Sequence, residues 1–466
     1  MPEHAARRSP DRRGVVITGL GAVTGLGIGM EPLWDGARLG RSCLRPITRL
    51  DASGFACRLA GEVGGKAMGG PAFSARDHVP KAFRKAVKIM ARDIELAVVA
   101  ALRAAADAGV STRAGAPDPE DDSFVGSYAG ERMGCHVGAG LIAAEPDELA
   151  AALATCRREG SERLDLTKWG SGGMDALTPL WMLKYLPNML ACHVTILHGC
   201  LGPSNTITCA EASGLLSIAE SVRVIERNDA DLCFAGGAES RVNLMGLLRM
   251  TFAGRLAPTG DQTEGERVVR PFDPASAGGL IGEGAGIITV ESAQTAAARG
   301  ARVYARVSGL GAAHSPVRPV ILRSDAPPPE DDEGFADAAR AAIADARLRP
   351  EDIDAVATLG TGVPHLDVPE AGALRRVFGA RTESLPLITL GPNIGSCAAG
   401  SAALVAAVAA RAVHEQRLPA RLNAGTPLPW LRAEAAPERP ASLGHVLVIT
   451  SALGGQNAAA ILSRAG

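Results

Sequence analysis

Short apolar runs alternate with longer stretches of helical periodicity through most of the chain. Residues 15–18 form an apolar run that glycines stop, which predicts a buried first strand. In residues 83–108 the apolar side chains recur at helical spacing, which predicts an amphipathic helix. Residues 207–209, 212–227 and 232–235 then predict a strand, a helix and a strand, which is the order of a βαβ unit.

The second half of the chain repeats this alternation. Its predicted strands and helices lie at residues 303–307, 335–346, 353–357, 370–378, 387–390 and 446–450. The pattern predicts an α/β fold in which mostly parallel sheets are buried between helices. The longest apolar stretch, residues 398–413, is interrupted by Ser401 and Arg411 and is shorter than the roughly 18 residues that cross a bilayer. It therefore predicts a buried helix.

Composition and charge limit the classes of partner. The chain carries 48 Lys and Arg against 50 Asp and Glu, so its formal net charge of −2 gives no reason to expect a nucleic acid or an anionic membrane as partner. The nine cysteines are scattered without Cys-x-x-Cys pairs, and the polar N-terminus is not followed by a signal-like apolar run. These features predict reduced thiols in a cytoplasmic protein without a metal site.

Six segments have the character of family motifs and occur in one order along the chain. They are VVITGLGAV near the start, PNMLACHVTILHGCLGPSNTITCAEASG at 187–214, CFAGGAES at 233–240, RPFDPASAGGLIGEGAG at 270–286, GTGVPHLDVPEAGALRRVFG at 360–379 and LGGQNAAAIL at 453–462. In this order and spacing they resemble the β-ketoacyl-acyl-carrier-protein synthase family of the thiolase superfamily. The resemblance implies a thiolase-like five-layered αβαβα fold of two similar halves, normally dimeric. We expect a flexible segment at residues 1–13 and the two halves at residues 14–270 and 271–466.

The resemblance also implies where a nucleophile should stand. In working members a cysteine at a helix N-terminus takes the acyl chain as a thioester, because backbone N–H groups and the helix dipole lower the pKa of its thiol. When the chain is aligned on Ala212-Ser213-Gly214, Glu211 occupies this position. A shifted alignment makes Cys209 the nucleophile, but it places the thiol upstream of the helix and loses the match at Ala-Ser-Gly.

The other residues of the condensation chemistry are replaced as well. Two histidines of working members hydrogen-bond the thioester oxygen and assist decarboxylation, and a lysine precedes the second of them. At the matching positions this chain has Leu359 and Ser396 for the histidines and Gly391 for the lysine. His365 lies near the first position, where a solvated or structural role is the plainer interpretation.

Two further sets of residues are candidates by position. The loop that gates the acyl tunnel in the family matches Ala452-Leu453-Gly454-Gly455-Gln456-Asn457, in which a leucine replaces the usual aromatic gate. Residues 180–190 predict a helix, and the region from Leu180 to Ile196 is the candidate contact with a second subunit. Its candidate residues are Trp181, Met189 and His193, for which packing in the chain's own core is the alternative.

Together, these replacements predict a ketosynthase-like subunit without the Cys-His-His set and without a cofactor. We expect it to act like a chain length factor, as partner of a catalytic β-ketoacyl synthase in type II fatty acid or polyketide biosynthesis, with an acyl carrier protein as a further partner. Chain length factors usually carry glutamine where this chain has Glu211. The alternative is an enzyme with altered chemistry that uses Glu211 as general acid or base on acyl-carrier-protein thioesters. A homodimeric acyl-binding scaffold is a third interpretation.

Overall fold

The strands of the protein form one large mixed sheet. The computed structural model describes residues 12–66, 69, 72–118, 124–316, 327–452 and 454–466. Along the sheet the strands are β11 (Leu387–Thr389), β10 (Ala355–Thr358), β14 (His445–Ser451), β15 (Gln456–Ser463), β9 (Ala305–His314), β1 (Val15–Thr24), β8 (Ile281–Ser292), β7 (Leu232–Ser240), β5 (Met133–Ala139) and β6 (Ser204–Ile207). Three short strands attach beside β1 and β8, namely β2 (Gly27–Ile28), β3 (Leu44–Pro46) and β4 (Leu59–Gly61). A separate ribbon consists of β12 (Arg417–Leu418) and β13 (Arg439–Pro440).

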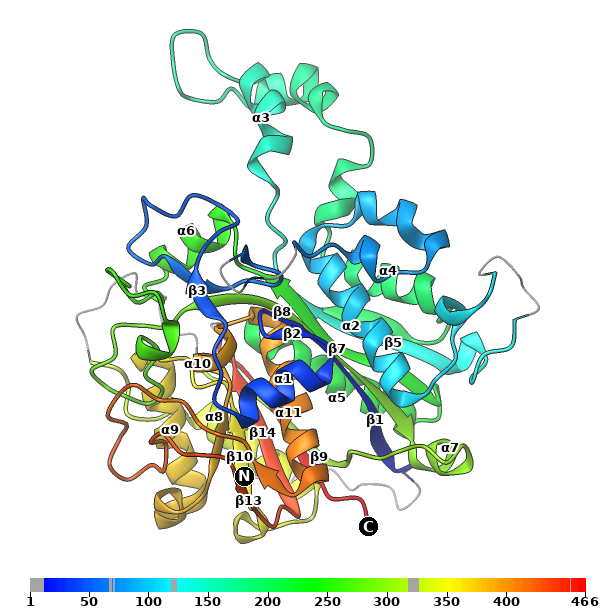
Figure 1. Ribbon diagram of the computed structural model, residues 1–466, viewed down its shortest axis with the longest axis vertical. Coiled ribbons are helices and arrows are strands. Elements are labelled where there is room, and N and C mark those ends of the chain that lie inside the picture. Colours follow the sequence, from blue (N-terminus) through cyan, green and yellow to red (C-terminus); the bar gives the residue numbers. More distant parts are fainter. Residues whose placement is uncertain (1–11, 67–68, 70–71, 119–123, 317–326, 453) are drawn as a thin grey trace.

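Three layers of helices enclose the two halves of this sheet. One outer layer contains α2 (Arg92–Ala108) and α4 (Met189–His198), and the other contains α8 (Glu333–Asp345) and α9 (Pro364–Phe378). The middle layer contains α5 (Ser213–Glu226) and α11 (Ser401–Glu415), which pack against both halves in one apolar core. This is the predicted five-layered αβαβα fold (Figure 1).

The side chains of single strands show that both sheet faces are buried. On β7, Leu232 and Phe234 pack into the core under α2 and α4, whereas Cys233 and Ala235 pack into the middle core. Successive side chains of a strand point to opposite faces, so a strand between two helix layers must be apolar throughout. This requirement explains the short apolar runs of the sequence.

The strand order repeats in the two halves. The order β6-β5-β7-β8-β1 corresponds to β11-β10-β14-β15-β9, with parallel and antiparallel pairs at the same places. The halves meet where β1 pairs with β9. In this correspondence β8 belongs to the N-terminal half, so we place the boundary between the halves after Ser292 instead of at residue 270.

The prediction of mostly parallel sheets was wrong. The pairs β7–β8, β8–β1, β14–β15 and β15–β9 are antiparallel. A buried apolar run has the same pattern whichever direction its neighbours take. The predicted strand end at the glycines after residue 18 was wrong too, because β1 continues to Thr24. A Cβ on Gly19 would lie 2.3 Å from the Ala104 carbonyl oxygen, so this glycine lets α2 approach the strand closely.

Two predicted helices are broken in the structure. The predicted helix at 83–108 consists of a 3₁₀ helix at Lys81–Ile89 and of α2, because the backbone of Met90 is extended between them. The predicted helix at 180–190 is a short 3₁₀ helix at Trp181–Tyr185, and α4 begins only at Met189. Pro187 separates the two, and a proline cannot donate a helical hydrogen bond.

An arm of residues 141–186 projects from the body of the molecule (Figure 1). It carries α3 (Pro146–Thr155) at its far end and returns through the 3₁₀ helix Trp181–Tyr185 to α4. The other α-helices are α1 (Met30–Arg38), α6 (Leu244–Phe252), α7 (Ala293–Ala298) and α10 (Gly391–Ile394). Within the described residues, every helix is too short or too polar to cross a membrane.

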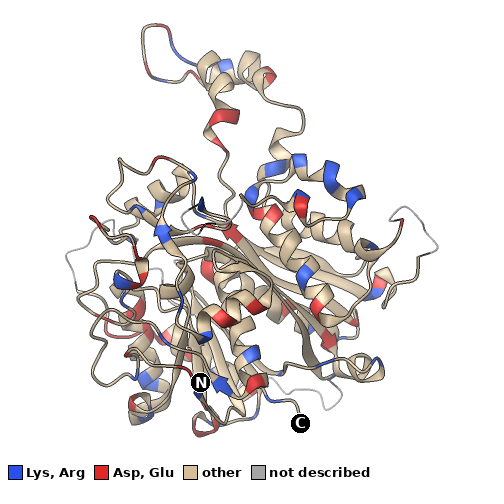
Figure 2. Cartoon of the chain, in the orientation of Figure 1, with Lys and Arg blue, Asp and Glu red and all other residues tan. Residues whose placement is uncertain are grey.

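Basic residues cluster on the 3₁₀ helix Lys81–Ile89 near the base of the arm (Figure 2). Its Lys81, Arg84, Lys85 and Lys88 are exposed, and none of them forms an ion pair with a described residue. We call these four residues the basic stripe. Such a group is notable in a chain whose formal net charge is −2.

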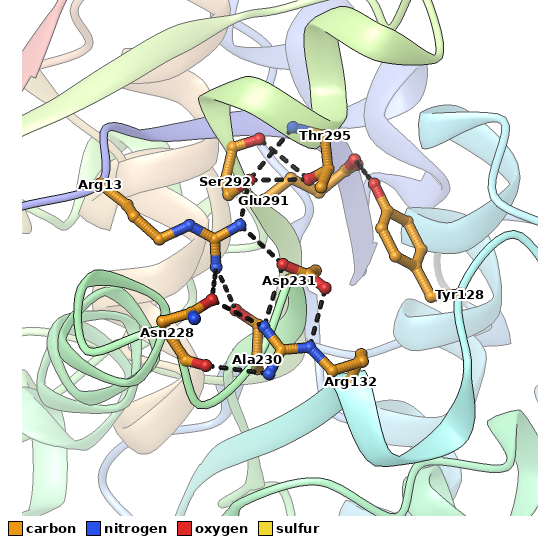
Figure 3. A network of polar contacts seen from close by, with 9 residues as sticks. All are labelled: Arg13, Tyr128, Arg132, Asn228, Ala230, Asp231, Glu291, Ser292 and Thr295. Atoms are coloured by element: carbon orange, nitrogen blue, oxygen red, sulfur yellow. Dashed lines mark hydrogen bonds and ion pairs between the residues drawn. The ribbon is translucent and has the colours of Figure 1, made fainter.

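A network around Arg13 anchors the start of β1 (Figure 3). The Arg13 guanidinium donates to Asn228 Oδ1 at 2.7 Å, to Asp231 Oδ1 at 2.7 Å and to Ser292 Oγ at 2.9 Å. Arg132 Nε donates to the other oxygen of Asp231 at 2.8 Å, and the two arginines lower the pKa of Asp231. The network lies at the start of β7, whereas the candidate site lies at its end.

Candidate functional site

A strained turn between β6 and α5 positions Glu211. The β6 strand ends at Ile207, so Cys209 lies beyond the strand and not at its end as predicted. Ala210 then has φ of 45°, which residues other than glycine rarely adopt. Ser213 Oγ accepts a hydrogen bond from Cys209 N at 2.7 Å and fixes the turn. The turn leaves Glu211 in the 3₁₀ turn Ala210–Ala212 directly before α5, with only 4% of its surface exposed.

Two arginines bind the Glu211 carboxylate. Arg241 Nη1 and Arg255 Nη1 each donate to Glu211 Oε1 at 3.1 Å. Arg241 directly follows β7, and its Nε donates to Glu239 Oε1 at 3.1 Å. The other oxygen of Glu239 accepts from Ala399 N at 3.0 Å. The four side chains Glu239, Arg241, Glu211 and Arg255 therefore form a chain of alternating charge that sums to zero.

This environment keeps Glu211 ionised. Burial by itself raises the pKa of a carboxyl group, but the neighbouring Arg241 and Arg255 outweigh burial and lower the pKa of Glu211 to about 2. In turn, Glu211 and Glu239 raise the pKa of Arg241 against the effect of its burial. A buried charge is tolerated when it is paired and hydrogen-bonded, which describes this cluster.

A small cavity lies beside Glu211. Its volume is about 30 Å³, and Ser396 and Thr361 line it together with Glu211 and Arg255. Glu211 Oε2 and Arg255 Nη2 are buried and have no partner among the described residues. The space suffices for about one water molecule between such groups, but not for a thioester. The lining residues that the structure describes include neither cysteine nor histidine.

The structure brings the replaced positions together in two pairs. Glu211 and Ser396 line the same cavity. Leu359 and Gly391 are joined elsewhere, because the Leu359 carbonyl accepts from Gly391 N at 2.9 Å. A Cβ on Gly391 would lie 1.9 Å from the Gly360 carbonyl oxygen, so the backbone leaves no room for a lysine there.

The alternative residues are not arranged for catalysis. Cys209 is partly exposed, and burial raises the pKa of its thiol instead of lowering it. A thiol with a raised pKa is a poor nucleophile. His365 lies in the first turn of α9, where it is exposed to solvent and does not line the cavity.

The predicted gate is fastened to a neighbouring strand end. Leu453 lies outside the described residues. Ser315 N donates to the Gly455 carbonyl at 2.8 Å, and Asn457 Nδ2 donates to Ser315 Oγ at 2.7 Å. Gly455 has φ of 85°, which favours glycine. Gly454, Gly455 and Asn457 do not line the cavity beside Glu211.

The three residues proposed for subunit contact lie in different surroundings. Trp181 contacts Tyr185 on the arm, with ring centroids 5.1 Å apart. Met189 packs against the core under α4, and His193 is buried within the chain, where burial lowers its pKa. The exposed apolar residue of α4 is Ile196.

Sequence reasoning missed Arg241 and Arg255. Arg241 follows the CFAGGAES segment directly, so its position at a strand end was a usable signal. No sequence pattern singles out Arg255, which reaches Glu211 from the turn after α6.

Comparison with known proteins identifies the family. The model "Beta-ketoacyl synthase, N-terminal domain" matches residues 12–296, and "Beta-ketoacyl synthase, C-terminal domain" matches residues 304–425. The chain belongs to the β-ketoacyl synthase family. The 3-oxoacyl-[acyl-carrier-protein] synthase 2 of Staphylococcus aureus (strain COL) is 28% identical over 452 residues, which cover 97% of this chain and 98% of that protein.

Solved structures of the family have the same fold. The ishigamide ketosynthase/chain length factor aligns with a TM-score of 0.76 and 28% identity, covering 98% of this chain and 100% of that one. A β-ketoacyl synthase from Burkholderia phymatum STM815 aligns with a TM-score of 0.75 and 26% identity, covering 97% and 100% of the two chains. Within this fold, an ion-paired carboxylate stands where the resemblance places the nucleophile.

Proposed function

We propose that the protein is a non-catalytic, chain length factor-like subunit that pairs with a catalytic β-ketoacyl synthase in type II fatty acid or polyketide biosynthesis. The observation that carries the proposal is the pairing of Glu211 with both Arg241 and Arg255. A carboxylate has no sulfur with which to form the acyl thioester, and these two ion pairs keep it buried. The cavity of about 30 Å³ beside it leaves no room for one either.

The alternative of acid–base chemistry at Glu211 is disfavoured by its environment. A general acid or base works best when its pKa lies near the working pH. The pKa of Glu211 is lowered to about 2, so near neutral pH it holds no proton to donate and is a weak base. The protonated state that such a cycle needs is therefore not populated near neutral pH.

The edge of the N-terminal half-sheet offers a surface for a partner subunit. The β6 strand is the last of the sheet and pairs only with β5 among the described residues. Its neighbours Ile196 and Leu201 are 62% and 71% exposed. An unpaired strand edge beside exposed apolar residues is a surface that proteins normally cover.

The arm adds exposed apolar side chains to the same proposal. Leu166 is 76% exposed, Leu180 is 61% exposed and Met182 is 60% exposed. Apolar residues on a projecting segment are typical of subunit interfaces, which are larger and more apolar when the complex is permanent. The name of the ishigamide structure joins a ketosynthase and a chain length factor, which is the kind of assembly that we propose here.

An acyl carrier protein is the second proposed partner. The name of the Staphylococcus relative, 3-oxoacyl-[acyl-carrier-protein] synthase 2, includes an acyl carrier protein. In this chain the basic stripe offers an acidic protein surface four exposed cations that form no ion pair with a described residue. Complementary charge raises association rates more than it raises affinity, as suits a transient carrier.

Co-expression with β-ketoacyl synthases encoded near its gene tests the proposal. We expect the two chains to elute as a heterodimer on gel filtration. When malonyl and acyl carrier proteins are added, mass spectrometry should detect the condensation product only if the synthase is present. Ile196→Lys together with Leu201→Lys should abolish the heterodimer, while Leu39→Lys, at a 47% exposed leucine after α1, should leave it intact. Condensation by the chain alone, or a homodimer that ignores every synthase, would contradict the proposal.

A further inference from the structure

Three arginines gather where the ribbon of β12 and β13 approaches β11, the strand at the edge of the C-terminal half-sheet. Arg421 lies just beyond β12, and its Nη1 donates to the carbonyl of Leu387, the first residue of β11, at 3.0 Å. Arg432 Nη1 donates to the Ser384 carbonyl in the segment that leads into β11, at 2.8 Å. Arg439 belongs to β13. The fold therefore brings these three side chains together from separate positions along residues 417–440.

Arg421 is buried without a counterion. Only 4% of its surface is exposed. Its guanidinium donates to backbone carbonyls, those of Glu434 at 2.7 Å and Leu387 at 3.0 Å, and it forms no ion pair with a described residue. Its Nη2 is buried and has no partner among the described residues. A buried charge is costly unless it is paired, so this arrangement calls for an anion.

The neighbouring arginines increase this need. The pKa of Arg421 is lowered to about 10 by burial and by the charges of Arg439 and Arg432, which together outweigh the opposing charge of Glu434. Burial and Arg432 also lower the pKa of Arg439. Glu434 is exposed, and neither it nor Arg432 nor Arg439 forms an ion pair with a described residue. Three guanidiniums and one carboxylate leave an excess of two positive charges at this place.

We propose that the three arginines bind a phosphate group, with Arg432 and Arg439 on its oxygens and the charge of Arg421 beneath them. Arg432 and Arg439 are partly exposed, so an anion reaches them from solvent. A phosphate monoester carries about −1.5 to −2 charges at neutral pH, which matches the excess better than the single charge of a carboxylate. Guanidinium groups also fit phosphate oxygens through paired N–H donors. The site goes beyond the proposed partner role.

The phosphate group can belong to free phosphate or to a small phosphate ester. Titration of the purified chain with inorganic phosphate and with methyl phosphate, followed by ³¹P NMR, distinguishes the two sources. We expect saturable broadening of the ³¹P line. Binding of both probes indicates a site for esters, and binding of inorganic phosphate alone indicates a site for the free ion. Acetate should compete at least about tenfold less effectively than phosphate, because it carries one charge and fewer acceptor oxygens.

Three variants test the contributions of the arginines. The Arg439 side chain forms no hydrogen bond with a described residue, so Arg439→Gln should fold normally and weaken phosphate binding at least about tenfold. Arg421→Gln should weaken it to a similar extent although this side chain is buried. Circular dichroism shows whether each variant is folded, and Arg439→Gln alone decides the test if Arg421→Gln is not. Arg306→Gln, at an exposed arginine of β9, is the matched control and should bind as the unaltered chain does.

Thermal unfolding provides a measurement that a purely structural arginine would not affect in the same way. Without phosphate, Arg439→Gln should unfold at a temperature at least as high as that of the unaltered chain, because one of three like charges is gone. Phosphate should raise the unfolding temperature of the unaltered chain and of Arg306→Gln, but not that of Arg439→Gln.

The proposal is wrong if neither phosphate probe binds, if acetate competes as well as phosphate, or if Arg439→Gln binds phosphate as the unaltered chain does. A loss of stability of Arg439→Gln in the absence of phosphate would also contradict it, because the arginine would then serve the fold itself. These measurements use the chain alone. Failure to find a partner synthase leaves them unaffected, so the two proposals can fail independently.

Discussion

Arg241 Nη1 reaches from the end of β7 to Glu211 Oε1 across 3.1 Å, and it thereby ties the sheet to the start of α5. Arg255 approaches the same oxygen from the turn after α6, also at 3.1 Å. The two ion pairs hold the buried Glu211 carboxylate between the end of β7 and the segment before α5.

The first prediction concerns removal of the Glu211 charge. Glu211→Gln keeps the side-chain shape but leaves Arg255 buried without an anion. We expect the free energy of unfolding to fall by about 3 kcal/mol, the usual size of the effect when one partner of a buried pair is lost. Urea denaturation at neutral pH measures it. Glu162→Gln, at a 97% exposed side chain, should leave stability unchanged. If both variants are equally stable, the cluster does not support the fold.

The stabilising effect of Glu211 should also depend on pH. Its pKa is lowered from the ordinary value of 4.5 to about 2 in the folded protein, so the unfolded chain binds the proton more readily. The stabilisation is therefore complete above pH 4.5 and is lost as the pH falls towards 2. The stability difference between the unaltered chain and Glu211→Gln should shrink over that window, as denaturation curves at pH 6 and pH 3 would show.

The contribution of Asp93 to stability should depend on pH in the opposite direction to that of Glu211. It is buried, and this burial, together with the nearby Glu239, raises the pKa of its carboxyl to about 7. Because the folded protein holds this proton more tightly than the unfolded chain, the contribution to stability is complete below about pH 4 and is lost as the pH rises to 7. Asp93→Asn keeps an oxygen for the bond from Ser240 N, at 3.1 Å in the unaltered chain.

We expect the Asp93→Asn chain to become the more stable of the two as the pH rises from 5 to 8, by on the order of a few kcal/mol. Thermal denaturation at both pH values measures the change. A constant difference between the variant and the unaltered chain would show that Asp93 does not titrate in this range.

Backbone strain before Glu211 provides another prediction. Ala210, in the turn directly before Glu211, has φ of 45°. A glycine adopts this conformation without a steric penalty. Ala210→Gly should therefore raise the free energy of unfolding by about 0.5–1 kcal/mol. This net figure includes the opposing effect of glycine, which gives the unfolded chain more conformational entropy to lose on folding. The same substitution at Ala219, within α5, should destabilise it by about 1 kcal/mol. If both substitutions destabilise the protein, the turn is not strained.

The sequence revealed the fold but not the ion pairs of the site. Helical periodicity located α5 and α8 within a few residues. The glycines after residue 18 predicted a strand end, whereas Gly19 lies inside β1 and lets α2 approach the strand closely. Strand direction was mispredicted because a run buried on both faces carries no sign of it.

The position of Glu211 followed from alignment on Ala212-Ser213-Gly214. Its partners did not, because Arg241 and Arg255 lie 30 and 44 positions further along the chain. Only the folded arrangement of β7 and α6 brings them to the same oxygen. Ion pairs of this range have no periodicity by which a sequence could show them.

The last prediction concerns the basic stripe. Lys85 and Lys88 belong to the 3₁₀ helix Lys81–Ile89, are exposed and have no described ion-pair partner. Their replacement by glutamate should weaken binding of an acidic acyl carrier protein at least about tenfold at low salt, and the difference should diminish at high salt because exposed charges are screened. Fluorescence anisotropy with a labelled apo carrier protein measures both effects. The double variant Arg306→Glu and Arg464→Glu makes the same change in net charge at other exposed positions. Equal weakening by both double variants would show that net charge, and not the stripe, governs the encounter.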